Sequence, residues 1–153
     1  MASEEIRCIV APLTYGHVLV PNIVVAELMD FTMPETLRRA PDWILGELVW
    51  NGWQVPVISF EHLISDGAAN TVTSKARILV IKTLGESIQV NYIGLIIQGL
   101  PRLKKITADN LLENLADELP EGVFSEVSID DLEAMIPELS SLTQLVEEAA
   151  YGN

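Results

Sequence analysis

The segment WILGELVWNGWQVPVISFEHL, residues 43–63, carries the strongest structural signal in the chain. Two apolar runs typical of β-strands flank Asn51-Gly52, and both of these residues tolerate a positive φ angle. A two-residue type I′ turn needs such residues at both central positions, so the segment predicts a β-hairpin. Counting outward from the turn pairs Trp50 with Trp53, which places two aromatic side chains on one face.

The same register places Leu48 and Val55 beside the tryptophans and pairs Glu47 with Pro56. Proline has no amide hydrogen to donate to a neighbouring strand, so it is found mainly at sheet edges and bulges. The sequence therefore predicts an edge or a bulge on the outer side of the strand that contains Pro56.

Composition indicates one folded domain across residues 1–153. The chain is 49% hydrophobic with a mean hydropathy of +0.30, which argues against disorder. No apolar run approaches the ~20 residues that a membrane helix needs, and the acidic start MASEEIR is unlike a basic signal peptide. We expect a cytoplasmic protein without membrane insertion.

Charge is distributed unevenly along the chain, whose formal net charge is −13. All nine Lys and Arg residues lie at or before Lys105, whereas twelve Asp and Glu residues lie from Asp109 onward. An acidic chain repels phosphates, so the sequence predicts no nucleic-acid binding. The acidic third is either a surface for a basic partner or a solubilising face, and the sequence leaves both interpretations open.

The remaining strand predictions come from β-branched runs bounded by turn residues. They cover Ile6–Pro12, His17–Met29 with a bend at Pro21-Asn22, Ala76–Thr83 joined to Ser87–Gln98 across Leu84-Gly85-Glu86, Leu100–Ile106, Val123–Ile129 and Leu132–Ile136. Helical signals predict a short turn at Phe60–Ser65, a helix over Thr107–Leu119 and an amphipathic helix after Pro137. Many short strands with few helices favour a mainly β, barrel-type fold.

Motifs for catalysis are absent from the sequence, which has no phosphate-binding loop, dinucleotide fingerprint, nucleophile elbow or Cys/His ligand pair. His17 and His62 are far apart, and the lone Cys8 sits in an apolar strand, where a free thiol packs as a small hydrophobe. Tryptophans 43, 50 and 53 could line a ligand pocket, although core and interface roles are the first expectation. The sequence predicts a protein that is not an enzyme and has no catalytic residues, no cofactor and no metal site.

A series of short motifs surrounds the central segment: Val20-Pro21, Val25-Ala26-Glu27-Leu28, Pro41-Asp42-Trp43-Ile44-Leu45-Gly46, Asn51-Gly52 and Val55-Pro56-Val57-Ile58. In these residues the chain resembles the CheW family of chemotaxis coupling proteins. The motifs are similar to the family patterns V-x-E-I, P-x-[FWY]-[IV]-x-G and N-x-R-G followed by V-P-V-I-D-L. Ile93-Gly94-Leu95-Ile96-Ile97 resembles a second signature, G-L-x-V-D, and the resemblance weakens between Thr107 and Val127.

This resemblance implies a CheW-like fold of two packed SH3-like β-barrel subdomains with short helices and a C-terminal helix. It also implies an adaptor between the regulatory domain of a histidine kinase and the cytoplasmic tip of a chemoreceptor. On the resemblance, the predicted partner-binding residues are Val25, Glu27, Gly46, Asn51, Gly52, Val55, Gly94 and Ile97. The alternative is a small-molecule-binding β-barrel without signalling partners.

Three polar positions depart from the family patterns. Asn51 stands where the family usually has arginine, while Ser59 and Gln98 replace aspartates. We interpret these as positions that set partner choice, which suggests a divergent adaptor of a type IV pilus or twitching-motility system. Asn51 is also a preferred residue for a type I′ turn, so a purely structural reason for it stays open.

Overall fold

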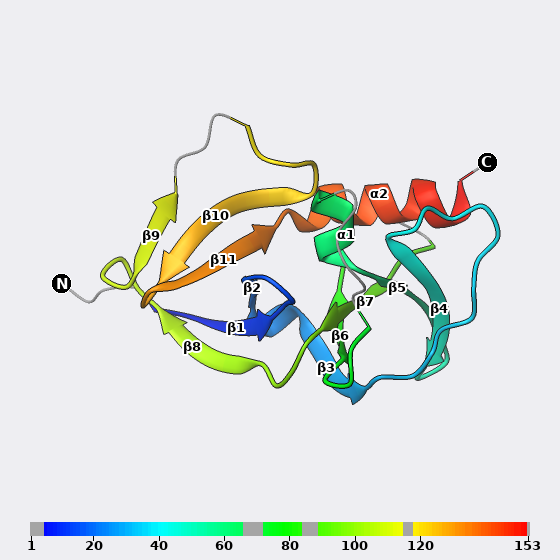
Figure 1. The fold of residues 1–153 in the computed structure, drawn as a ribbon, viewed down its shortest axis with the longest axis horizontal. Coiled ribbons are helices and arrows are strands. Elements are labelled where there is room, and N and C mark those ends of the chain that lie inside the picture. Colours follow the sequence, from blue (N-terminus) through cyan, green and yellow to red (C-terminus); the bar gives the residue numbers. More distant parts are fainter. Residues whose placement is uncertain (1–4, 66–71, 84–88, 115–117, 153) are drawn as a thin grey trace.

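The computed structural model describes residues 5–65, 72–83, 89–114 and 118–152 and contains two sheets that lie side by side (Figure 1). The six-stranded first sheet has the order β8-β1-β2-β11-β10-β9, and the five-stranded second sheet has the order β3-β6-β7-β5-β4. The first sheet is built from both ends of the chain and the second from its middle. The predicted mainly β fold with two subdomains and a C-terminal helix is confirmed.

The first sheet consists of β1 (Ile6–Pro12), β2 (His17–Pro21), β8 (Arg102–Ile106), β9 (Leu111–Asn114), β10 (Val123–Ile129) and β11 (Leu132–Pro137). The second consists of β3 (Val25–Asp30), β4 (Ile44–Trp50), β5 (Trp53–Ile58), β6 (Arg77–Lys82) and β7 (Tyr92–Ile97). The helices are η1 (Asn22–Val24), α1 (Phe60–Ile64) and α2 (Leu139–Tyr151).

Apolar side chains form three cores. One core contains only residues of the first sheet, such as Val10 and Ile129, and another contains only residues of the second sheet and its loops, such as Val57 and Ile78. The largest core draws on both sheets and on α2, for example Val18, Leu79 and Leu142. Burial of apolar surface in this shared core therefore holds the two subdomains together.

The central hairpin has the predicted register. Trp50 pairs with Trp53 and Glu47 with Pro56, and the turn residues Asn51 and Gly52 have φ angles of 48° and 81°. Pro56 does not mark an edge, because β5 lies between β4 and β7. The parallel ladder to β7 begins only at Val57, one residue after the proline, so the missing amide costs that ladder nothing.

The predicted strand His17–Met29 is divided between the two sheets. β2 ends at Pro21, the single turn of η1 follows, and β3 begins at Val25 in the second sheet. The bend predicted at Pro21-Asn22 is therefore the point at which the chain passes from one subdomain to the other.

The predicted helix over Thr107–Leu119 is wrong in its described part, because residues Leu111–Asn114 form β9. Residues 115–117 of the predicted helix lie outside the described residues. Leu111 packs against the first-sheet core, whereas the next residue, Leu112, is 69% exposed, so the leucines alternate as they do in a strand. The side chain of Asn110 also accepts a hydrogen bond from the amide of Thr107 at 2.8 Å, which favours a turn over a helix start.

The other predicted elements agree with the structure apart from their bounds. The second hairpin exists, but Lys82 pairs with Tyr92, and β7 begins at Tyr92 instead of Ser87. The predicted turn at Leu84-Gly85-Glu86 lies outside the described residues. Helix α2 is amphipathic as predicted, with Leu139, Leu142 and Val146 buried.

Candidate partner-binding surfaces

The tip of the β4–β5 hairpin presents two of the predicted contact residues to solvent. Asn51 and Gly52 are both exposed, and a Cβ added at Gly52 would meet no atom within 4 Å. Side chains at this turn therefore point into open space, where another protein can reach them.

Glu27 lies close to this hairpin through a contact between two outer strands. Trp50 Nε1 donates a hydrogen bond to Oε2 of Glu27 at 3.1 Å. β3 and β4 stand at opposite ends of the strand order, so this bond shows that the two edges of the curled second sheet approach each other. The predicted residue Glu27 and the hairpin tip thus belong to one region of the surface.

An aromatic cluster completes this region. The ring of Tyr92 stacks edge-on between two tryptophans, with centroid distances of 4.9 Å to Trp50 and 5.4 Å to Trp53. Tyr92 was not singled out from the sequence, because it lies 39 positions after Trp53 on another strand. We call Glu27, Trp50, Asn51, Gly52, Trp53 and Tyr92 the hairpin surface.

Gly46 has a structural role that the family pattern does not explain by itself. Its φ angle is 148°, and a Cβ at this position would overlap the carbonyl group of Glu35. Glu35 pairs with Glu47 through two backbone hydrogen bonds of 2.8 and 2.9 Å, which holds the crossing segment against β4. Gly46 is buried and permits this crossing, so it offers no side chain to a partner.

Three other predicted contact residues are also buried, which corrects their assignment to a partner surface. Val55 and Ile97 are fully buried, and a Cβ at Gly94 would lie 2.9 Å from Cγ2 of Ile78. The missing side chain at Gly94 thus permits a close contact inside the second subdomain. Val25 is half-buried and packs on the shared core, so only Glu27, Asn51 and Gly52 are exposed.

The two other departures from the family patterns differ in accessibility. Ser59 is 1% exposed, and its Oγ accepts a hydrogen bond from the amide of His62 at 3.2 Å, so it caps α1 and meets no partner directly. Gln98 is half-exposed, and its backbone amide donates to the carbonyl of Pro12 at 2.8 Å, which joins the two subdomains.

Glu61 is a structural residue that sequence reasoning missed. Its carboxylate is largely buried and accepts hydrogen bonds from the backbone amides of Thr14 at 2.8 Å and Tyr15 at 3.1 Å. The turn between β1 and β2 is therefore held by a side chain from α1, on the other subdomain. No local sequence signal indicates a contact across 46 positions.

A second long-range polar contact fixes the end of α2. The hydroxyl of Tyr151 donates to Oε2 of Glu47 at 2.7 Å. Burial, and then the bond to the Glu47 carboxylate, raise the pKa of Tyr151 above its ordinary value. The tyrosine thus stays protonated and keeps the helix docked on β4.

Two observations on the described residues concern metal binding and thiol chemistry. The described part of the chain contains no group of three or more His, Cys, Asp or Glu residues that could hold a metal ion. Cys8 is buried, and burial raises the pKa of its thiol, so the reactive thiolate is disfavoured. Within the same residues, no helix is long and apolar enough to cross a membrane.

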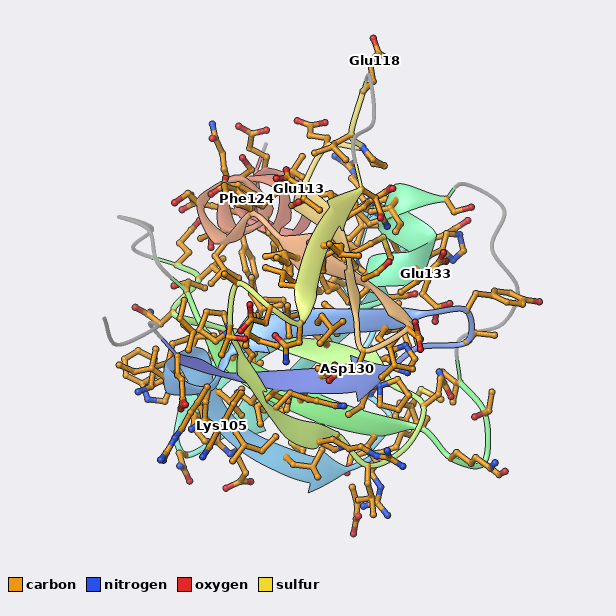
Figure 2. All side chains as sticks on the ribbon, turned by 90° about the vertical axis from the view of Figure 1, so that its left-hand side faces the viewer. Lys105, Glu113, Glu118, Phe124, Asp130 and Glu133 are labelled. Carbon is orange, nitrogen blue, oxygen red and sulfur yellow. The ribbon has the colours of Figure 1, made fainter. Side chains whose placement is uncertain are left out.

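One face of the first subdomain carries acidic, basic and aromatic side chains (Figure 2). Figure 2 shows Glu113, Glu118 and Phe124 in the upper part of this face and Lys105 in the lower part. Leu112 and Phe124 are 69% and 64% exposed. The two interpretations of the acidic third therefore both stay open.

Comparisons with known proteins agree with this architecture. The model of the CheW-like domain matches residues 8–147. The crystal structure of the scaffolding protein TtCheW from Thermoanaerobacter tengcongensis is similar, with a TM-score of 0.75 and 16% sequence identity. The alignment covers 98% of this chain and 97% of that chain. No curated protein matches the chain.

Proposed function

The chain belongs to the CheW-like domain family, and from this premise we propose that it is a non-enzymatic adaptor in bacterial chemosensory signalling. It couples a chemoreceptor to a histidine kinase of the chemotaxis type, through the receptor's cytoplasmic tip and the kinase's regulatory domain, and it works in the cytoplasm. The observation that carries the proposal is the hairpin surface, which combines exposed turn residues with aromatic side chains at one end of the second subdomain.

The chemistry of this surface suits a protein partner. Trp53 is 44% exposed beside Tyr92, and the Glu27 carboxylate lies next to them through its bond to Trp50. Aromatic side chains dominate the energy of many protein interfaces, and a neighbouring charge gives such contacts direction. Partner binding at this surface needs no rearrangement of the buried strands.

Asn51 gives the adaptor a partner set unlike that of a typical family member. Arginine would offer a fixed positive charge and a planar fork of donors, whereas asparagine is neutral and shorter. The loss of one charge-assisted contact lowers affinity by roughly 1.5–3 kcal/mol, which is about tenfold to a hundredfold or slightly more. We assign the chain to a dedicated array, such as one that controls type IV pili and twitching motility.

Binding of the purified protein to the receptor tip and to the kinase regulatory domain of the same cell tests the coupling role directly. Isothermal titration calorimetry should give saturable binding to at least one of them. Trp53→Ala should weaken that binding about tenfold or more, as expected for an interface aromatic residue. Phe124→Ala, which removes an exposed aromatic side chain from the first subdomain, is the matched control. Equal effects of the two substitutions, or no binding at all, would contradict the proposal.

Asn51→Arg tests the proposal that Asn51 sets the choice of partner. The variant should gain about tenfold or more in affinity for the receptor tip of a standard chemotaxis system. Gln54→Arg adds the same charge on the same hairpin and should leave that affinity unchanged. If Asn51→Arg also leaves it unchanged, asparagine serves only the turn and the recognition role fails.

A further inference from the structure

A cavity at the first subdomain gathers cationic groups in an otherwise acidic protein. Its volume is about 250 Å³, and the cations Arg102 and Lys104 line it together with His17, Val10, Pro12, Leu100 and Leu132. No Asp or Glu is among the lining residues, although the chain has 22 acidic and nine basic residues. The lining therefore carries two positive charges and no negative one, which the composition alone does not lead one to expect.

The strand pairing explains why these cations converge. Arg102 pairs with Val10 and Lys104 with Cys8, and both partners belong to the first-sheet core. Paired residues of neighbouring strands share a face, so Arg102 and Lys104 extend from the side of β8 that faces that core. Leu103 and Lys105 alternate with them and extend from the opposite side of the strand.

The polar side chains of the cavity differ in the contacts that they already make within the protein. Lys104 Nζ lies 3.4 Å from Oδ2 of Asp130, a weak ion pair at the edge of the cavity. Nδ1 of His17 lies 3.2 Å from the carbonyl oxygen of Glu133, which requires that this nitrogen donates. Arg102 has no ion pair within the described part of the chain, so its guanidinium can bind an incoming anion.

Apolar walls stand next to these cations. Val10 is 3% exposed and marks the inner end of the cavity, while Leu132 is half-buried and Leu100 is 66% exposed. A cavity of this size lies just below the ~300–1,000 Å³ of typical ligand pockets, which limits the ligand to a small molecule. Cationic groups beside an apolar wall match a ligand that has an anionic head and a short apolar body.

We propose that this cavity binds a small amphiphilic carboxylate, with its anionic group between Arg102 and Lys104 and its apolar body against Val10, Leu100 and Leu132. The site lies on the first subdomain and does not depend on the proposed coupling role. A straight-chain carboxylate such as octanoate is a suitable probe, because it carries one charge and fills a narrow apolar space.

The test is isothermal titration calorimetry of the whole chain with octanoate, acetate and octanol. Octanoate should bind saturably at one site, and both acetate and octanol should bind at least tenfold more weakly, because each lacks one half of the recognition chemistry. If acetate binds as tightly as octanoate, the proposed contact with the apolar wall is wrong. If octanol binds as tightly as octanoate, the proposed contact with the cations is wrong. Absence of saturable octanoate binding would overturn the site.

Substitutions on one strand locate the binding. Arg102→Gln should weaken octanoate about tenfold or more, whereas Lys105→Gln changes the net charge equally on the opposite side of β8 and should have less than a twofold effect. Leu132→Trp should abolish binding by filling the cavity. Circular dichroism checks that the variants remain folded, and Arg102→Gln remains decisive because Arg102 is exposed. Equal losses in Arg102→Gln and Lys105→Gln would mean nonspecific attraction and would overturn the proposal.

Discussion

The β4–β5 and β10–β11 hairpins have the same loop length and nearly the same backbone, but different turn residues. Asn51 and Gly52 have φ angles of 48° and 81°, while Asp130 and Asp131 have φ angles of 46° and 72°. Asparagine followed by glycine adopts these angles at low energetic cost. Aspartate at the second position adopts a left-handed backbone that is unfavourable for a residue with a Cβ atom. Only the first turn is encoded by its own residues.

The second turn is held by its surroundings. Ile129 pairs with Leu132 on either side of it, and Lys104 from β8 forms the ion pair with Asp130. Strand pairing and one weak ion pair thus surround a turn whose own residue, Asp131, disfavours the backbone it adopts. The two hairpins thus show that the same turn can be specified locally or imposed by the fold.

Gly46→Ala should destabilise the protein most, because no space is left for a side chain at this β4 residue. The added Cβ would overlap the Glu35 carbonyl and would also hold a φ of 148°. We expect a loss of about 3 kcal/mol or more in the free energy of unfolding, measured by urea denaturation. Gly52→Ala, with open space around the Cβ, should lose only about 1 kcal/mol. Similar losses in the two variants would show that conformation, and not space, dominates.

Glu61→Ala should have the next largest effect, because it removes the long-range support of a third turn. Two backbone amides, of Thr14 and Tyr15, would lose their acceptor. We expect a loss of about 2 kcal/mol in the free energy of unfolding and faster hydrogen exchange at both amides. Glu61→Gln, which keeps one acceptor oxygen, should lose less. Unchanged exchange at these amides would show that the turn holds itself.

Asp131→Gly should stabilise the protein, which makes the contrast between the two hairpins quantitative. Glycine would remove the cost of the left-handed conformation, a gain of about 1 kcal/mol in thermal or urea unfolding. The reciprocal change, Gly52→Asp, should lose a similar amount. A neutral or destabilising Asp131→Gly would mean that the aspartate makes a contact worth more than the strain.

Glu138→Gln tests the smallest effect, a pH-dependent helix cap. Oε2 of Glu138 accepts a hydrogen bond from the amide of Ser141 at 2.7 Å. Hydrogen bonding from the side chain of Ser141, and then from this amide, holds the pKa of the Glu138 carboxyl below its ordinary value of 4.5. Because the pKa is lowered in the folded state, the stabilisation is present above 4.5 and is lost as pH falls through the lowered value. Urea unfolding at pH 6 and pH 3 should differ less in Glu138→Gln than in the parent. The Ser59 cap of α1 carries no charge and serves as the pH-independent comparison.

Candidate site residues could be predicted from the sequence only where they lie on a local element. The family patterns pointed to eight positions, of which Glu27, Asn51 and Gly52 are exposed. Val55 and Ile97 belong to the same patterns but are fully buried, because a pattern preserves the scaffold as well as the contact surface. Tyr92 joins the hairpin surface only because β7 is brought beside β5.

The sequence by itself determined the features that depend on neighbouring residues. The Asn51-Gly52 turn fixed the pairing of Trp50 with Trp53, and the period of the apolar residues after Pro137 fixed the buried side of α2. Both follow from backbone preferences and side-chain spacing within a few positions.

Only the tertiary structure decided the features that depend on partners far along the chain. Leu111 and Leu112 favour a helix when considered alone, yet they form a strand because they pair with β10. The hydrogen bonds and core contacts of this strand outweigh a helix propensity of less than about 1 kcal/mol per residue. The Glu61 contact with the β1–β2 turn likewise arises from packing of the two subdomains, and the convergence of Arg102 with His17 arises from the pairing of β8 and β2 with β1 in the first sheet. Such contacts join residues separated by dozens of positions, so no short window of sequence contains them.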